Sequence, residues 1–414
     1  MRIIHTADWH LGHELHGIDR NFEHRRFLDW LLETLAAREA DALIVCGDVF
    51  DSANPPAVAQ LLLYRFLADL RARLPRVQTV IIAGNHDSPA RLEAPRALLK
   101  LIDCHVVGTL PRINGGLDLE RLLIPLRDRD ERIAAWCAAV PFLRPADLPP
   151  VAADDDHDPL IEGVRRLYGQ VAAAARARRR PRQALVATGH CYMTGTRLSE
   201  LSERKILGGN QHALPADLFA DDIGYTALGH LHLAQAVGNR AGVRYSGSPL
   251  PLSLTERRYP HQIVQIDLHG DDHVDVEAIP APRTVEVLRL PEAGSATLAE
   301  LLPQLQGLRA DPGKPARQWP FLEVAVRLER PEPGLRRQLD EALEGRPVRL
   351  LKITTDYAGD NAPLADALPA GDLKELDPEE VFRLRHRQVH GSDPAAGLTA
   401  AFHQLLAAVQ EETP

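Results

Sequence analysis

The sequence predicts an α/β protein, because short strand-like runs alternate with helical patterns in its first half. Three apolar runs, RIIHTAD (2–8), ALIVCGD (42–48) and TVIIAGNHD (79–87), each carry Gly, Asp, Asn or His at their ends. Segments 27–38 and 58–74 lie between them and have apolar residues at helical spacing. Alternation of this kind predicts a layered α/β domain.

The alternation loosens over residues 112–183, where the clearest pattern is an amphipathic helix at 160–178. Strand patterns return at 183–190, 222–232 and 261–268. We therefore expect the first domain to continue to about residue 279.

A second, smaller α/β unit is predicted after two prolines in AIPAPRTVEV (278–287). Strands are predicted at 284–290, 321–328 and 348–357, with helices at 297–308 and 333–345 between them. Two C-terminal helices follow a loose stretch, and Asp377 and Pro378 mark the start of the first. The predicted domains are residues 1–279, 283–358 and 373–412.

Composition excludes several protein classes. The chain has 414 residues, of which 45% are hydrophobic and 25% charged, as in ordinary globular proteins of two or three domains. No apolar run approaches the ~18 residues of a membrane span, and MRIIHTADWH lacks the apolar core of a signal peptide. The four cysteines show no CxxC spacing, so we expect reduced thiols and a cytoplasmic location. The net charge of −9 argues against a protein that simply coats nucleic acid.

Side chains that bind metals follow five of the apolar runs. The candidate ligands are Asp8, His10, Asp48, Asn85, His190, His230 and His232. In D-x-H (8–10) and H-x-H (230–232) the period of two is expected to point both side chains to one side of an extended chain. Carboxyl ends of strands are where α/β sheets place their sites.

Seven ligands are enough for two cations if Asp48 bridges them. A mixed nitrogen and oxygen set without thiolates suits Mn²⁺, Fe or Zn²⁺ and disfavours Cu(I) or iron–sulfur clusters. Two cations ~3.5–4 Å apart activate a bridging water and stabilise both the attacking and departing oxygens of a phosphodiester.

The ordered motifs D-x-H, GD-x-x-D, GNHD, GH and GH-x-H resemble those of the calcineurin-like metallophosphoesterases. Further segments resemble the SbcD family, the nuclease subunits of bacterial SbcCD complexes. These segments are ADWHLG (7–12), GDVFDSANPP (47–56), GNHDS (84–88), PFLRPADL (141–148), ALGHLH (227–232), YSGSPLPLS (245–253) and LDPEEVFRLRHR (376–387). The resemblance covers nearly the whole chain. It implies a four-layer αββα metallophosphoesterase sandwich, a small α/β capping domain that recognises DNA, and C-terminal helices that bind the ATPase SbcC.

The resemblance also implies roles for single residues. It assigns one metal to Asp8, His10, Asp48 and His232, and the other to Asp48, Asn85, His190 and His230. Two Mn²⁺ ions are expected, with Mg²⁺, Fe or Zn²⁺ as alternative occupants. His86 would contact the scissile phosphate and assist the leaving oxygen, and Asp87 would orient it. Archaeal and eukaryotic relatives carry a second active-site histidine where this chain has Asp51, so the role of that histidine does not transfer.

The implied activity is Mn²⁺-dependent DNA cleavage in repair, recombination and replication. It comprises 3′–5′ exonuclease action on double strands and endonuclease action on single strands. The implied partners are DNA, a second copy of the chain, and SbcC in a heterotetramer with two copies of each protein. Two alternatives remain, a metallophosphatase or small-molecule phosphodiesterase on the same site, and a non-enzymatic scaffold. The complete ligand set with His86 argues against the scaffold, and the additional C-terminal units argue against a minimal phosphatase.

Two further surfaces each have two interpretations. The densest basic run is either a DNA-contacting patch or a solvated helix end, and includes Arg176, Arg178, Arg179 and Arg180. The apolar residues of the C-terminal helices either bind the partner, which we favour because they follow a loose linker, or form intramolecular core. They include Val381, Phe382, Leu398, Phe402 and Leu405.

Overall fold

The computed structural model describes most of the chain. The described residues are 1–148, 158–197, 213–270, 273–308, 311, 313–330, 332–357, 378–395, 397–399 and 401–402. Within them, no helix is long and apolar enough to cross a membrane.

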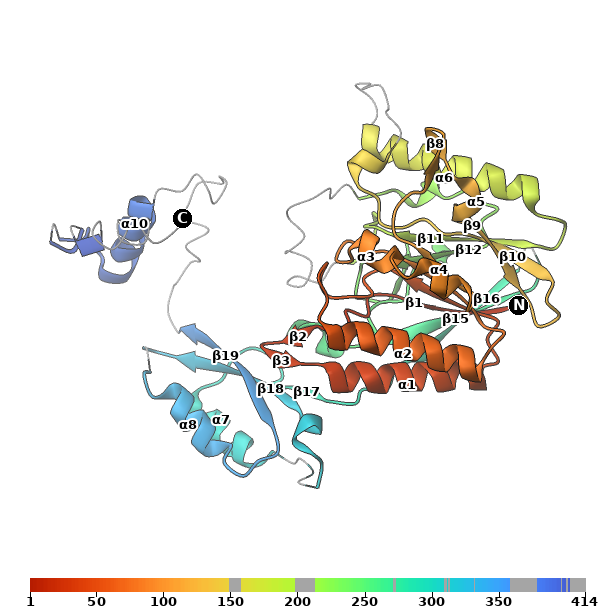
Figure 1. The fold of residues 1–414 in the computed structure, drawn as a ribbon. Helices are drawn as coiled ribbons and strands as arrows, with labels where there is room; N and C mark the ends of the chain where they lie inside the picture. Colours follow the sequence, from red (N-terminus) through yellow and green to blue (C-terminus); the bar gives the residue numbers. More distant parts are fainter. Residues whose placement is uncertain are drawn as a thin grey trace.

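Two six-stranded mixed sheets form the centre of the larger unit (Figure 1). The first sheet has the order β16 (Val274–Pro280), β15 (Gln262–Leu268), β1 (Arg2–Thr6), β4 (Ala42–Cys46), β5 (Gln78–Ile82) and β6 (Cys104–Val107). The second has the order β13 (Gln235–Val237), β14 (Arg240–Tyr245), β12 (Tyr225–Gly229), β11 (Ala184–His190), β10 (Ile133–Ala138) and β9 (Leu123–Arg127). Strands β1, β4, β5 and β6 are parallel, and so are β10, β11, β12 and β14.

Helices cover the outer face of each sheet, with α1 (Asn21–Ala37) and α2 (Ala57–Arg73) on the first and α6 (Pro159–Arg178) on the second (Figure 1). Successive residues of β4 point to opposite sides. Leu43 packs with α1 and α2, whereas Ile44 packs in the core shared with the second sheet. The predicted four-layer αββα sandwich is therefore confirmed.

Short elements connect the layers. They are β2 (Glu14–Leu15), β3 (Ile18–Asp19), α3 (Pro89–Glu93), α4 (Arg96–Lys100), β7 (Arg112–Ile113), β8 (Gly116–Leu117), α5 (Leu119–Leu122), η1 (Pro145–Asp147), η3 (Ala216–Leu218) and η4 (Leu254–Arg258). The segment 112–183, which is loosely patterned in sequence, contains β9 and β10. β10 (IAAWCA) is rich in alanine, which has low strand propensity, and β9 contains Pro125, so neither has a strong strand pattern.

A smaller unit contains a parallel three-stranded sheet of β17 (Val287–Leu290), β18 (Phe321–Leu328) and β19 (Arg349–Tyr357). Helices α7 (Leu298–Gln306) and α8 (Leu335–Ala342) pack on it, and η5 (Ala316–Gln318) precedes β18. We call residues 283–357 the capping unit. A separate apolar cluster joins Val287 and Phe321 of this unit to Leu15 and Leu254 of the sandwich. Beyond it, α10 spans Pro378–His390.

Candidate metal centre and active site

The seven candidate ligands lie in or at the ends of loops along one edge of the two sheets. They follow the carboxyl ends of β1, β4, β5, β11 and β12, which are parallel strands within their own sheets. The structure brings ligands of both sheets together. Side-chain donor atoms of Asp8, His10 and His232 lie within 4.8 Å of one another, and so do those of Asp8, Asp48 and His190.

The backbone at these loops is unusual. Asp8, His10, Asp48 and His230 have φ values of 53°, 46°, 47° and 102°, in a region that non-glycine residues rarely adopt. The expectation that the 8–10 and 230–232 pairs share one side of an extended chain is therefore wrong, because β1 ends at Thr6 and β12 at Gly229. Left-handed turns beyond the strands orient these ligands instead, and such strain is typical of functional sites.

Two glycines allow the loops to approach one another closely. A Cβ atom on Gly84 would lie 2.1 Å from Oδ1 of Asp48, and one on Gly229 would lie 1.8 Å from the carbonyl oxygen of Cys46. Any side chain at either position would push the ligand loops apart.

One group of donors surrounds His10 and Asp48. Nε2 of His10 lies 3.6 Å from Oδ2 of Asp48, and this buried nitrogen has no hydrogen-bond partner among the described residues. Buried polar atoms without a partner are rare, and a divalent ion between these side chains would supply one for this nitrogen. The donor set therefore fits a divalent metal site.

A second group of donors converges on Asn85. Its Oδ1 lies 2.9 Å from Nε2 of His190 and 3.1 Å from Nδ1 of His230. Nε2 of His190 is also 3.3 Å from Oδ2 of Asp48. Asp48 thus lies between the two groups of donors.

Three hydrogen-bond acceptors outside these groups orient the imidazole rings. The Nδ1 atoms of His10, His190 and His232 lie 3.1 Å from Asp51 Oδ1, 2.8 Å from the Cys46 carbonyl oxygen and 3.0 Å from Glu256 Oε1. Each contact occupies Nδ1 and leaves Nε2 available for a metal ion, as is typical of metal-binding histidines. The sequence does not predict these contacts. Asp51 is notable there only because relatives have a histidine at that position, and no motif in the sequence identifies Glu256.

Electrostatics at the site favour a bound cation. Burial opposes ionisation of Asp48, but His190 and His10 hold the pKa of its carboxyl well below the usual range. Burial would lower the pKa of His190, yet Asp48 raises it to about 9, and Glu256 likewise raises the pKa of His232 to about 9 against burial. In the metal-free protein, protonated rings thus neutralise the buried carboxylates. Divalent ions would replace these protons.

His86 lies beside the ligands with an exposed side chain. Its backbone N–H donates to Oδ1 of Asp48 at 2.8 Å, and its ring centroid is 4.9 Å from that of His10. The ring atom Nδ1 lies 2.9 Å from the carbonyl oxygen of Asp51. Because a carbonyl only accepts, Nδ1 carries a hydrogen and Nε2 is left for other contacts.

The carboxylate of Asp87 contacts the backbone of the two loops that surround His86. Its buried carboxylate accepts backbone N–H groups of Gly84, Val49 and Phe50 at 2.9, 3.1 and 2.9 Å. Burial and the nearby charge of Asp48 raise the pKa of Asp87 to about 6. Asp87 therefore ties the loops after β4 and β5 together, and the Asp51 carbonyl orients the His86 ring.

The arginines predicted to contact DNA lie far from this edge. They are at the C-terminal end of α6 and in the turn after it: Arg176, Arg178, Arg179 and Arg180. This turn leads into the start of β11, whose seven residues separate it from His190 by roughly 20 Å. Arg176 and Arg179 pair with Asp222, and Arg178 pairs with Glu120. Both placement and pairing favour the interpretation as a solvated helix end.

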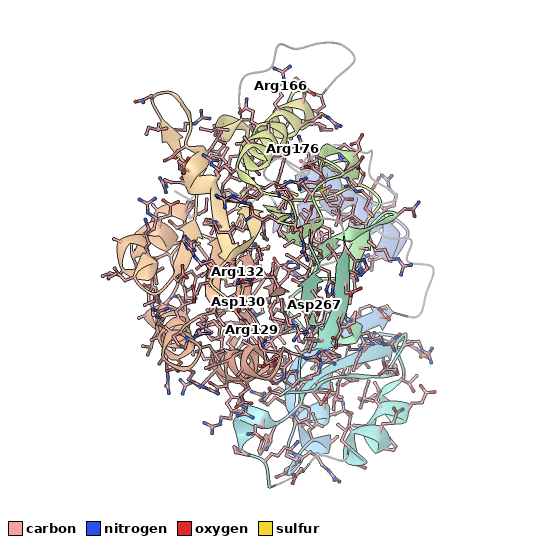
Figure 2. The ribbon with its side chains drawn as sticks, turned by 90° about the vertical axis from the view of Figure 1, so that its right-hand side faces the viewer. Arg129, Asp130, Arg132, Arg166, Arg176 and Asp267 are labelled. Atoms are coloured by element: carbon pink, nitrogen blue, oxygen red, sulfur yellow. The ribbon has the colours of Figure 1, made fainter. Side chains whose placement is uncertain are left out.

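Figure 2 faces that opposite edge of the sandwich. Arg129, Asp130 and Arg132 of the β9–β10 connection lie there with Asp267 of β15, and Arg176 is visible on α6. Charges of both signs are interleaved on this edge, where Arg132 pairs with Asp130.

One cation packs on a ring beside the candidate ligand His190, although no charge pattern in the sequence indicates it. The ring of Phe142 packs edge-on against His190, with ring centroids 6.1 Å apart. The Arg144 guanidinium carbon lies 5.5 Å from the Phe142 ring, and Arg144 forms no ion pair with the described part of the chain. Within the described residues, Arg144 is thus a positive charge without an ion-pair partner, and it lies against a ring that packs on His190.

The predicted partner-binding residues are described in part. The rings of Phe382 and Phe402 stack with centroids 4.3 Å apart, so these two side chains contact each other. Leu398 is exposed. Val381 lies in α10. Leu405 falls outside the described residues.

Comparisons with known proteins agree with this geometry. Residues 1–234 match the family model of calcineurin-like phosphoesterases, and residues 282–390 match the model described as the type 5 capsule protein repressor C-terminal domain, SbcD_C. The chain is 45% identical over 388 residues to the SbcD protein of the SbcCD nuclease from Rhodobacter capsulatus, with 92% of this chain and 93% of that protein covered. It is 33% identical to the protein of the same name from Escherichia coli K12, with 93% and 92% covered. Identity to the Bacillus subtilis protein of that name is 28%, with 100% and 99% covered. The chain therefore belongs to the SbcD family of calcineurin-like phosphoesterases.

Proposed function

We propose that this chain is a Mn²⁺-dependent DNA nuclease that holds two metal ions and acts with the ATPase SbcC in DNA repair and recombination. The observation that carries the proposal is the position of Asp48. Its Oδ2 lies 3.6 Å from His10 and 3.3 Å from His190, which belong to different donor groups. A carboxylate between two such groups supports a pair of cations.

The ligand assignment follows the two groups. Asp8, His10, Asp48 and His232 would hold one ion, and Asp48, Asn85, His190 and His230 the other. When bound, the ions would activate water and stabilise negative charge on the scissile phosphate. Burial lowers the pKa of His230 to about 3, so this ring is neutral and free to coordinate.

His86 would act on the substrate rather than on the metals. Its Nδ1 hydrogen is committed to the Asp51 carbonyl, so the exposed Nε2 is the atom that meets a phosphodiester. In the protonated ring, Nε2 donates to a phosphate oxygen or passes its proton to the departing 3′ oxygen. Either contact is strongest in the transition state.

We further propose three functional units: a nuclease domain at 1–279, a DNA-recognising capping domain at 283–358, and a segment at 373–412 that binds SbcC. The names of the relatives, which make them part of SbcCD, support the last assignment. A second copy of the chain is a further proposed partner. Leu61 of α2 and Leu98 and Leu101, in and directly after α4, are large apolar side chains exposed on the sandwich, which supports a contact between copies.

The test is an activity comparison on metal-free protein resupplied with Mn²⁺. We expect cleavage of linear and hairpin DNA and of a small phosphodiester, little cleavage of a phosphate monoester, and faster DNA processing with SbcC and ATP. Cleavage of the monoester without cleavage of DNA would establish the metallophosphatase alternative. Mn²⁺ binding without any hydrolysis would support the scaffold.

A further inference from the structure

Glu256 is a fully buried carboxylate in η4, and one of its side-chain hydrogen bonds is to the candidate ligand His232. Its exposed fraction is 0%. Oε1 lies 3.0 Å from Nδ1 of His232 and accepts the Ser253 hydroxyl at 3.2 Å, while Oε2 accepts the backbone N–H of Leu252 at 2.8 Å. Because both oxygens are engaged, the carboxylate cannot rotate without losing hydrogen bonds.

This arrangement determines which nitrogen of His232 carries the hydrogen. An ionised carboxylate only accepts hydrogen bonds, so Nδ1 of His232 must donate to it. The lone pair of the neutral ring is then on Nε2, on the side of the ring away from Glu256. Side-chain donor atoms of Asp8, His10 and His232 gather within 4.8 Å of one another.

The opposite side of η4 contacts the capping unit. Leu254 is buried in an apolar cluster with Val287 and Phe321 of the capping unit. Arg258 Nε donates to Oε1 of Glu292 at 3.0 Å, and Arg257 donates to the carbonyl oxygen of Glu292 at 2.9 Å. Leu254 and Glu256 are two residues apart in η4, so the contact with the capping unit and the contact with His232 lie within a single turn.

We infer that Glu256 is a positioning residue that fixes the tautomer and direction of the His232 ring, and that η4 links this ring to the position of the capping unit. The inference rests on the proposed metal-dependent function. In this arrangement the capping unit affects the metal site without supplying a ligand. A substrate that moves the capping unit would change the affinity of the ion held by His232, and leave the ion held by His190 and His230 less affected.

Glu256→Gln in the full chain tests the positioning role. The substitution preserves the shape of the side chain. It replaces one of the two carboxylate oxygens by an N–H₂ group, which cannot accept a hydrogen bond. Keeping the Leu252 contact directs the amide at His232, which then needs its hydrogen on Nε2. We expect one of two Mn²⁺ ions to bind about 10–100-fold more weakly, while the affinity for the other ion stays near wild type. The melting temperature of metal-free protein should fall, because the substitution removes the buried carboxylate that pairs with His232. Glu277→Gln, at an exposed carboxylate paired with Arg38, is the matched control and should change neither metal affinity nor melting temperature.

Wild-type affinity for both ions in Glu256→Gln would overturn the inference. Equal weakening of both ions would also overturn it, since that pattern indicates only a structural role. Leu254→Ala tests the link to the capping unit while leaving Glu256 in place. We expect it to weaken the same ion by a smaller factor, and unchanged binding would disprove the link. The readout is Mn²⁺ occupancy, so wild-type protein that binds two ions but does not cleave DNA would overturn the proposed function alone.

Discussion

The two sheets of the sandwich supply the candidate metal centre in different ways. The first sheet provides the oxygen ligands Asp8, Asp48 and Asn85 together with His10, on loops where three of these four residues have a left-handed backbone. The second sheet provides only imidazoles. Its His190 is the last residue of β11 and needs no unusual backbone.

The two sheets also differ in how hydrogen bonds hold their candidate ligands in place. In the first sheet the backbone is fixed: Asp87 binds three N–H groups of the ligand loops, and Asp8 accepts the N–H of His230 at 3.0 Å from the other sheet. In the second sheet the side chains are oriented, because acceptors such as Glu256 decide which ring nitrogen is free. Loss of Asp48, which the first sheet supplies to both donor groups, should therefore remove both ions, whereas changes in the second sheet should act on one ion.

The largest effect is expected from Asp48→Ala. Asp48 is the carboxylate between the two donor groups, so its removal deprives both ions of a ligand. We expect bound Mn²⁺ to fall from two ions per chain to none, and cleavage to fall to background. Metal analysis after equilibration with Mn²⁺ measures the first, and a phosphodiester assay the second.

The control for this experiment is Asp130→Ala, at an exposed carboxylate on the opposite edge (Figure 2). It should bind two ions and cleave normally. If Asp48→Ala retained one tightly bound ion, Asp48 would not bridge, and the contrast between the sheets would be wrong.

A smaller effect is expected from His86→Gln. His86 follows β5 of the first sheet, and within the described residues its ring has no hydrogen bond to the side chain of a candidate ligand. The ring is exposed and bonded to a backbone carbonyl, so neither metal binding nor melting should change. Cleavage should fall by ~10²–10³-fold, as expected for loss of one donor to the transition state. His105→Gln, on β6 and paired with Asp103, is the matched control. Loss of metal in step with activity would instead make His86 a ligand.

Much of the fold can be predicted because apolar periodicity is a local signal. Strand β18 matches the predicted range of 321–328, and α6 differs from 160–178 by one residue. β10 escapes prediction because its small residues form a strand only when neighbouring strands pair with both of its edges. These strands are β9 and β11, which no local window contains.

The candidate site shows the same limit. Motif spacing identifies the seven candidate ligands, since each lies at the end of a strand-like run, and the structure places donor atoms from both sheets within 4.8 Å of one another. Partners distant in sequence are not predictable: Glu256 meets His232 across 24 residues, and Asp222 meets Arg176 across 46. A basic run in the sequence therefore looks available for DNA, although carboxylates elsewhere in the chain neutralise most of it.

The contact between the sheets can be tested through pH. His5 of β1 is fully buried, and its Nδ1 lies 3.0 Å from the hydroxyl of Tyr225 on β12. Burial lowers the pKa of His5 from 6.5 to about 3. Between these two pKa values the unfolded chain binds one more proton at this position than the folded chain does, so stability falls as pH is lowered through this window.

For metal-free protein we expect His5→Gln to reduce the pH dependence of the free energy of unfolding by about 1.4 kcal/mol per pH unit in that window. Denaturant unfolding across the acidic part of this window measures it. His269→Gln, at an exposed histidine paired with Asp275, should leave the slope unchanged. An unaltered slope in His5→Gln would show that His5 is protonated in the folded state.

The smallest effect is expected at Arg144, and it contrasts the two edges of the second sheet. Arg144 stacks on Phe142 beside His190 and has no ion-pair partner in the described part of the chain, whereas Arg176 is paired with Asp222 at the other edge. A His86→Gln background should bind DNA without rapid cleavage, and in it Arg144→Ala should weaken DNA binding uniformly across sequences. It should also reduce the slope of log affinity against log salt by about 1, as loss of one phosphate contact does. Arg176→Ala should change neither quantity, because its charge is already neutralised and lies roughly 20 Å from the ligands. The opposite result would mean that DNA runs along α6, and that charge density in the sequence predicts the binding surface better than proximity to the metals.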